Sequence, residues 1–72
     1  MVENELEKSR KVLGSKLRHA RRIANLTQLE VATRSGVHVN FYARVERGEE
    51  NPSFEKLQNI MKVLKIKSID IY

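Results

Sequence analysis

Cysteine is absent from this 72-residue chain, which excludes disulfide bonds and thiolate metal sites and suits a reducing cytoplasm. Long apolar runs are absent too. Uncharged apolar stretches span only a few residues, far short of the ~20 that cross a bilayer. The first residues carry acids rather than bases, unlike a secretion signal. We therefore expect a cytoplasmic protein with no membrane partner.

Sequence patterns that carry catalytic or metal chemistry are also scarce. The two histidines, His19 and His38, lie nineteen residues apart with no carboxylate at ligand spacing, so no metal site is predicted. The three glycines are scattered and form no phosphate-binding loop. Serine and histidine occur without the context of a catalytic nucleophile. We expect neither an enzyme nor a bound cofactor.

What remains is a short and basic chain, predicted to form one domain over residues 1–72. At this size only ~60% of the unfolded surface can be buried. Fourteen Lys and Arg residues against nine Asp and Glu residues give a net charge of +5, which favours a polyanionic partner. Residues 8–22 hold seven of these bases and no acid. This segment can be a solvated helix face, a surface that meets phosphate, or both.

Apolar residues recur at helical spacing through most of the chain. A first helix is predicted from about residue 4 to Ala24, with residues 1–11 as an N-terminal helical extension. Gly14 inside this helix costs roughly 1 kcal/mol relative to alanine, so the turns before it could form a separate or frayed piece. Asn25 stands where a left-handed residue commonly ends a helix.

The central segment predicts two short helices joined by a glycine turn. Thr27 and Glu30 have the spacing of a capping box, and the helix after Thr27 is expected to run to about Arg34, before Gly36. The next helix is predicted from about Val39 to Arg47, with one apolar side facing inward. Two such helices at a steep angle allow the second to protrude into a DNA major groove.

The last segment predicts a closing amphipathic helix after Ser53. Its apolar stripe consists of Phe54, Leu57, Ile60, Met61 and Leu64. A short fifth helix is expected from Ile69 to Tyr72, capped by Ser68. Alternating strand patterns of useful length are absent. The predicted fold class is therefore all-α, a compact five-helix bundle.

Three runs of this sequence, LTQLEVATRSGV, HVNFYARVERG and ENPSFEKLQNIMKVL, resemble the phage repressor and Cro type of helix-turn-helix. This XRE-like family comprises bacterial and phage-encoded regulators, and the resemblance spans roughly residues 12 to 71. It implies the lambda-repressor-like fold, binding to double-stranded DNA and transcription regulation, in a small protein like Cro or a restriction-modification controller. The chain departs from the family pattern at Asn25, Leu29 and His38.

The resemblance also assigns roles to individual side chains. Those expected to meet base edges in the major groove are Val39, Asn40, Ala43 and Arg44. Those expected to reach phosphates are Thr27, Gln28, His38, Arg21 and Asn51. Arg21 is further expected to pair with Glu46. The chemistry of the base-contacting set is suitable, because arginine can fork to guanine, asparagine can pair with adenine, and valine can cover a thymine methyl group.

A single small domain makes few base contacts, so we expect a homodimer on a palindromic operator. Surplus apolar residues near the C-terminal end predict the interface at Ile66, Ile69, Ile71 and Tyr72, although these residues could also close the bundle. With no effector domain, no small-molecule effector is expected. The alternatives are the DNA-binding fragment of a longer regulator, an antitoxin, and a protein-interaction module with the same fold.

Overall fold

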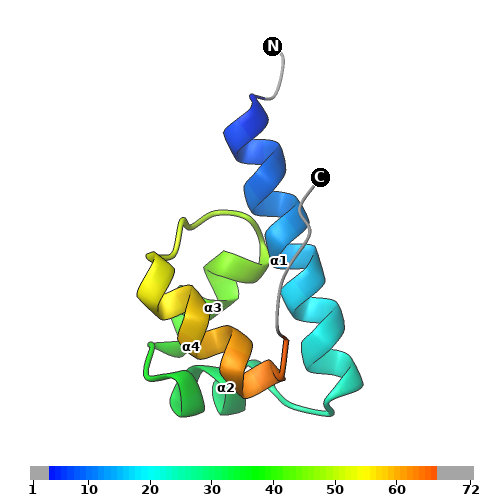
Figure 1. The fold of residues 1–72 in the computed structure, drawn as a ribbon, viewed down its shortest axis with the longest axis vertical. Coiled ribbons are helices and arrows are strands. Elements are labelled where there is room, and N and C mark those ends of the chain that lie inside the picture. The colour runs from blue at the N-terminus through cyan, green and yellow to red at the C-terminus, as the bar shows by residue number, and fades with distance from the viewer. Residues whose placement is uncertain (1–3, 67–72) are drawn as a thin grey trace.

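The computed structural model describes residues 4–66, and this part of the chain contains four helices (Figure 1). They are α1 (Glu5–Ile23), α2 (Gln28–Ser35), α3 (Val39–Glu46) and α4 (Phe54–Leu64). The predicted all-α class is confirmed for these residues. The predicted count of five helices is not: the described fold has four, and the expected fifth helix, from 69 to 72, lies outside the described residues.

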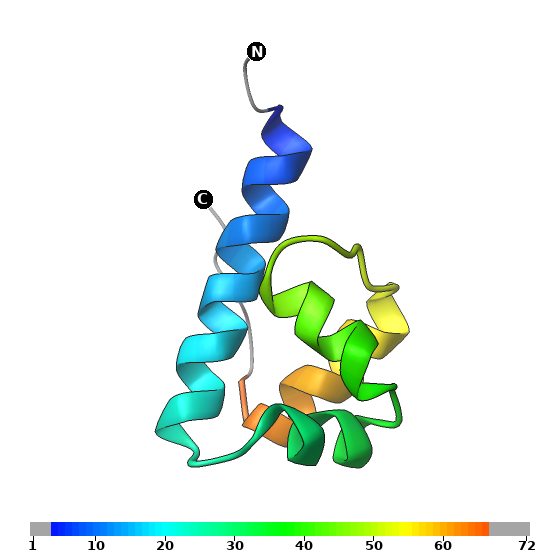
Figure 2. The same ribbon diagram turned by 180° about the vertical axis from the view of Figure 1, so that it is seen from behind.

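Helix α1 is continuous from Glu5 to Ile23, so Gly14 neither breaks it nor separates its first turns. Asn4 caps its start by accepting a hydrogen bond from the Glu7 amide at 2.8 Å. Acids in the first turn and bases in the last turn complement the helix dipole. Residues 5–11, which belong to the predicted extension, continue this helix and project beyond the other three (Figures 1 and 2).

Helix α2 begins and ends as its sequence signals require. The Thr27 hydroxyl accepts from the Glu30 amide at 3.0 Å, while the Glu30 carboxylate accepts from the Thr27 amide at 2.8 Å, which completes the capping box. Gly36 then adopts the left-handed conformation, with φ of 78°, and turns the chain toward α3. Before that, Asn25 takes φ of 58°, as expected for the end of α1.

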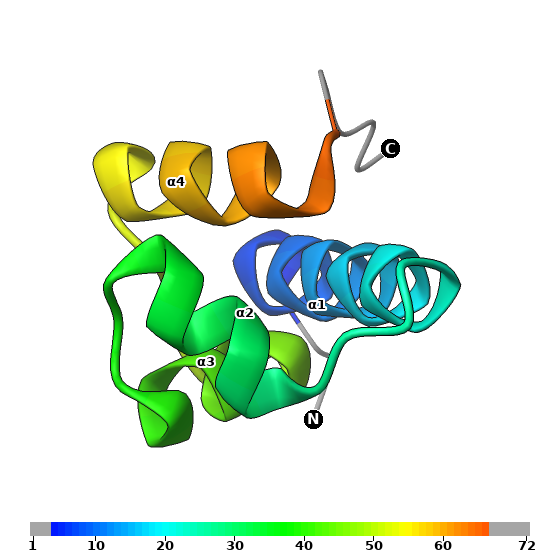
Figure 3. The same cartoon turned by 90° about the horizontal axis from the view of Figure 1, so that it is seen from below.

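The four helices pack around a small apolar core. Helix α4 packs against α2 and α1, while α3 packs against α1 and α2, and Figure 3 shows α4 on the side of the molecule away from α3. The buried apolar residues come from all four helices: Leu17, Val31, Ala32, Tyr42, Val45, Ile60 and Leu64. Each follows the helical periodicity of the sequence. The core thereby fixes the orientation of α3 through its inner side.

Gly14 lies at a close approach between α1 and α3. A Cβ atom at this position would overlap the backbone carbonyl oxygens of Val45 and Glu46. The C-terminal end of α3 can therefore rest directly on the α1 backbone only because residue 14 has no side chain. Glycine destabilises a helix relative to alanine, but the tight packing of α3 on α1 requires it at this position.

Several large apolar side chains remain exposed, including Phe54 of the predicted apolar stripe and Leu6 of the predicted N-terminal extension. Phe54 is 75% exposed, because it is the first residue of α4 and its side of that turn has no helix against it. Leu6 is also exposed, since the first turns of α1 extend beyond the body of the molecule. Within residues 4–66, none of the helices combines the length and the apolar character needed to cross a membrane.

Candidate DNA-binding face

The outer side of α3 carries the four side chains predicted to read bases. Val39, Asn40, Ala43 and Arg44 follow an i, i+1, i+4, i+5 spacing, and none of them is fully buried. On the opposite side of the helix, Tyr42 and Val45 are completely enclosed in the core. The structure thus brings the four predicted residues together on one accessible face of a helix anchored by its other face.

The N-terminal end of α3 is capped by an imidazole. His38 accepts a hydrogen bond from the Asn40 amide through Nδ1, at 3.0 Å. Because Nδ1 accepts, the neutral ring carries its hydrogen on Nε2, and that N–H is directed away from the cap. His38 therefore takes the capping role usually given to serine or threonine and keeps one donor on an exposed side chain.

Two arginines at the C-terminal end of α3 pair with the loop after it, Arg44 within the helix and Arg47 at its C-cap. Arg44 donates through Nε to Glu50 at 3.0 Å, and Arg47 lies 3.2 Å from the carboxylate of Glu49. Sequence analysis missed both pairs. The sequence nevertheless holds a hint of these pairs. Two consecutive acids follow Gly48, and two arginines lie within the four residues before that glycine.

A buried carboxylate joins α1, α2 and α3 behind this face. Glu46 has a fully buried side chain and accepts two hydrogen bonds from Arg21, through Nε at 2.7 Å and Nη2 at 3.1 Å. It also accepts from Gln28 Nε2 at 3.0 Å, and Arg18 Nε lies 3.6 Å away. The family resemblance implied the Arg21 contact; the contacts from Gln28 and Arg18 had no signal in the sequence.

The charges of this cluster stabilise one another. Burial raises the pKa of the Glu46 carboxyl, but its contacts with Arg21, Tyr42 and Gln28 outweigh burial, so the pKa falls below its ordinary value. The hydrogen bond to Glu46 raises the pKa of Arg21 in turn. Burial also raises the pKa of the Tyr42 phenol, which lies against the same carboxylate. Glu46 is therefore held ionised in the interior by its partners.

The residues predicted to reach phosphates occupy three places. Thr27, Gln28 and Arg21 lie where α1 and α2 meet, and Arg21 also donates through Nη1 to the Leu26 carbonyl at 3.0 Å. His38 lies at the start of α3, and Asn51 is exposed in the loop before α4. Gln28 uses one of its two amide hydrogens on Glu46, and the other remains for an outside acceptor.

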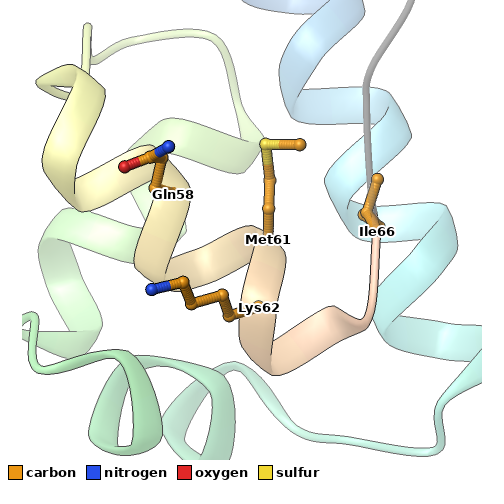
Figure 4. Close-up of a pocket in the computed structure, with 4 residues that line it drawn as sticks. All are labelled: Gln58, Met61, Lys62 and Ile66. Carbon is orange, nitrogen blue, oxygen red and sulfur yellow. The ribbon is translucent and has the colours of Figure 1, made fainter.

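Other kinds of site depend on different features of the described residues. Among the residues that the structure describes, no group of three or more histidine, aspartate or glutamate side chains is placed to hold a metal ion. A shallow pocket of about 200 Å³ lies on the outer side of α4, lined by Gln58, Met61, Lys62 and Ile66 (Figure 4). It is open, contains no pair of acid and base, and lies away from α3.

Sequence comparisons agree with this geometry. The family model for helix-turn-helix domains matches residues 17–71. An HTH-type transcriptional regulator of Sinorhizobium fredii is 34% identical over 62 residues, which cover 86% of this chain and 80% of that protein. An HTH-type transcriptional regulator of Mycobacterium tuberculosis is 36% identical over 59 residues, covering 82% of this chain and 42% of that longer protein.

Solved structures show the same likeness. The restriction-modification controller protein C.AhdI from Aeromonas hydrophila matches with a TM-score of 0.78 and 29% identity, over 81% of this chain and 88% of its own. The clp gene regulator ClgR from Corynebacterium glutamicum matches with a TM-score of 0.82 and 30% identity, over 88% and 81%. The resemblance drawn from the sequence is thereby confirmed.

Proposed function

The chain belongs to the helix-turn-helix family of DNA-binding transcription regulators, and on that premise we propose a specific role for it. It binds a palindromic operator in duplex DNA as a homodimer, with α3 in the major groove. The observation that carries this proposal is the accessible face of α3, which presents Asn40, Arg44 and two apolar side chains while its other side is locked into the core.

The chemistry of that face matches base edges. Arg44 offers a planar fork of donors for guanine O6 and N7, and Asn40 offers a donor and an acceptor for adenine. Val39 and Ala43 lie beside them on α3. Their side chains are apolar, so they can contact thymine methyl groups without leaving a polar group unpaired. We assign direct readout to these four residues.

Phosphate contacts would set the position of α3 in the groove. Five residues are assigned to this role: Thr27, Gln28, Arg21, His38 and Asn51. The N-termini of α2 and α3 add backbone N–H groups and positive dipole ends. Arg21 and Gln28 are preorganised for a phosphate, since Glu46 fixes both side chains while each retains further hydrogens.

A homodimer requires an interface that leaves both α3 helices free. Half-sites one helical turn apart place the two recognition helices ~34–36 Å apart. The outer side of α4 is compatible with this condition, because it faces away from α3 (Figure 3). It carries Met61, and Ile66 lies just after the helix beside the same open pocket (Figure 4). Ile66 is part of the predicted interface; Ile69, Ile71 and Tyr72 lie outside the described residues.

The relatives support a regulatory role for this chain. They include transcription regulators and a controller protein of a restriction-modification system. We place the protein in the bacterial cytoplasm, where the chromosome is, and propose that its own concentration sets operator occupancy.

Selection from a random-sequence duplex library tests the proposal. The wild-type protein is expected to enrich two-fold symmetric sequences whose half-sites are centred about 10 base pairs apart. Affinity for the enriched duplex should exceed that for unselected DNA by at least ~10³ at physiological salt. Enrichment of no sequence, with binding to heparin as tight as to DNA, would reduce the protein to a nonspecific polyanion binder. Failure to bind DNA even at low salt would favour a protein-interaction module.

A further inference from the structure

The acidic loop after α3 is unexpected beside a face that meets DNA. Glu49 and Glu50 both follow the turn at Gly48, and each one pairs with an arginine of α3 or of its C-cap. A carboxylate near the phosphate backbone repels it and lowers affinity. Acidic residues in this loop would therefore weaken DNA binding unless they also improve another property of the face.

The two pairs differ in geometry. Glu50 Oε2 accepts a hydrogen bond from Arg44 Nε at 3.0 Å, and the two side chains are 44% and 34% exposed, with Arg44 the more exposed. Glu49 lies 3.2 Å from a terminal Nη2 atom of Arg47, and both side chains are at least half exposed. The Glu50 contact is thus the more enclosed of the two, and it engages the arginine on the base-reading face.

We infer that Glu50 is a specificity-determining positioning residue that holds Arg44 for base readout. This inference rests on the proposed function and adds a residue to it. Glu50 does not touch the bases itself. It acts through Arg44, by fixing the direction in which that guanidinium group points.

The atom used in the contact is decisive. Guanidinium is planar and rigid, so a hydrogen bond through Nε sets the plane and the direction of the whole group. Recognition of guanine needs two donors for O6 and N7, and a bond at Nε leaves the Nη1 and Nη2 groups available for that fork. The Arg44 Nε donor is therefore already bound to Glu50, and both terminal amino groups are kept for a base.

Preorganisation also explains why the acid is tolerated. A free arginine side chain loses rotamer freedom when it binds a base, and a side chain that is already held loses less. An unrestrained arginine can also turn to any nearby phosphate, and the Glu50 carboxylate opposes that alternative by repulsion. Glu50 would thus lower affinity for DNA in general and raise the preference of Arg44 for its base pair.

Two alanine variants in the same loop separate these effects. Glu50→Ala and Glu49→Ala each remove one negative charge, one residue apart, but only the first releases Arg44. Both variants and Arg44→Ala would be used to select duplexes from the random library, and dissociation constants would be measured for the best duplex and for one with the Arg44 base pair changed. Thermal unfolding of each variant checks that the fold is kept.

Both loop variants are expected to bind unselected DNA more tightly, and by similar factors, because each loses one repulsive charge. Only Glu50→Ala should lose discrimination at the Arg44 base pair, by about tenfold, within the range of a bidentate contact. Glu50→Gln, which retains an acceptor for Arg44 Nε, should restore most of that discrimination. A purely structural role for Glu50 would instead lower the unfolding temperature and leave base preference unchanged.

Two further outcomes would contradict the role of Glu50, and a third would contradict the placement of α3 in the major groove. If Arg44→Ala relaxes base choice while Glu50→Ala behaves like Glu49→Ala, Glu50 contributes only charge and the inference is wrong. If Glu50→Ala increases discrimination, Glu50 sequesters Arg44 from DNA, and the inference is again wrong. If Arg44→Ala leaves base choice intact at every position, the placement of α3 in the proposed function fails, and the inference fails with it.

Discussion

Arg21 donates two hydrogen bonds to Glu46, through Nε at 2.7 Å and through Nη2 at 3.1 Å, and thereby ties α1 to the last residue of α3. The pair is well shielded: the Glu46 side chain is fully buried and that of Arg21 is 13% exposed. A buried pair of this kind is costly to break, because the remaining charge is left without a partner. The orientation of α3 therefore depends on an electrostatic contact as well as on the apolar core.

Arg21 and Glu46 should be energetically coupled. We expect Arg21→Ala or Glu46→Gln to lower the free energy of unfolding by about 3 kcal/mol. The double mutant should lose less than the sum of the two, with a coupling of at least ~0.5 kcal/mol in denaturant unfolding. The exposed pair Arg34–Glu30 provides the control, with an expected coupling of ~0.3–0.5 kcal/mol at most. Equal couplings in the two cycles would show that burial adds nothing to the Arg21 contact.

Acid should unfold the protein partly through Glu46. Its pKa is lowered in the folded state, so its contribution to stability is complete above the unfolded pKa of about 4.3 and is lost as pH falls through the lower, folded value. We expect Glu46→Gln to be less stable at neutral pH but to lose less stability on acidification. Denaturant titrations from pH 7 down to pH 2 measure this. Plots of unfolding free energy against pH that run parallel for the wild type and Glu46→Gln below pH 5 would contradict this expectation.

Gly14→Ala should destabilise the protein although alanine favours helices. The added methyl group would overlap the carbonyl oxygens of Val45 and Glu46, so α3 must shift away from α1. We expect a loss of ~1–3 kcal/mol from this overpacking. Ser15→Ala, at the next and exposed position of α1, is the matched control and should be neutral or slightly stabilising. A stabilised Gly14→Ala variant in thermal unfolding would mean that the two helices are not in tight contact.

Arg44 and Gln28 should affect DNA binding in different ways. Arg44→Ala is expected to weaken operator binding by ~1–3 kcal/mol and to relax base choice at one position of each half-site. Gln28→Ala should weaken binding to all sequences alike, since a phosphate contact carries no base information. Arg34→Ala removes one positive charge from an exposed position on α2, and it therefore controls for the change in net charge. Fluorescence anisotropy against a set of operator variants distinguishes the three. Sequence-independent losses in Arg44→Ala would place α3 outside the groove.

The dimer should depend on the apolar residues near the C-terminal end. We expect Ile69→Ser and Ile71→Ser together to give a folded monomer whose operator affinity is lower by orders of magnitude, because each half-site then binds alone. Leu29→Ser replaces an exposed apolar residue of α2 that is not part of the predicted interface, and it should leave the association state unchanged. Sedimentation at micromolar concentration measures both variants. A wild-type chain that is monomeric there, or a double variant that still dimerises, would exclude this interface.

Local signals in the sequence determined the four described helices and the accessible face of α3. Each of these signals involves residues that are close together in the sequence. Examples are the Thr27–Glu30 capping box, the left-handed Asn25 directly after α1, and the inward pair Tyr42 and Val45. Contacts at such short separations follow from backbone geometry, so they can be read directly from spacing. The accessible face of α3 follows in the same way, as the side left over once the core side is known.

Only the tertiary structure decided which distant groups meet. The role of Gly14 could not be read from α1, because its reason lies in the carbonyl groups of α3. The contact between Gln28 and Glu46, and that between Arg44 and Glu50, depend on the angle between helices and on the path of a loop. Long polar side chains have many rotamers, and the choice among them is made by packing between elements rather than by local sequence.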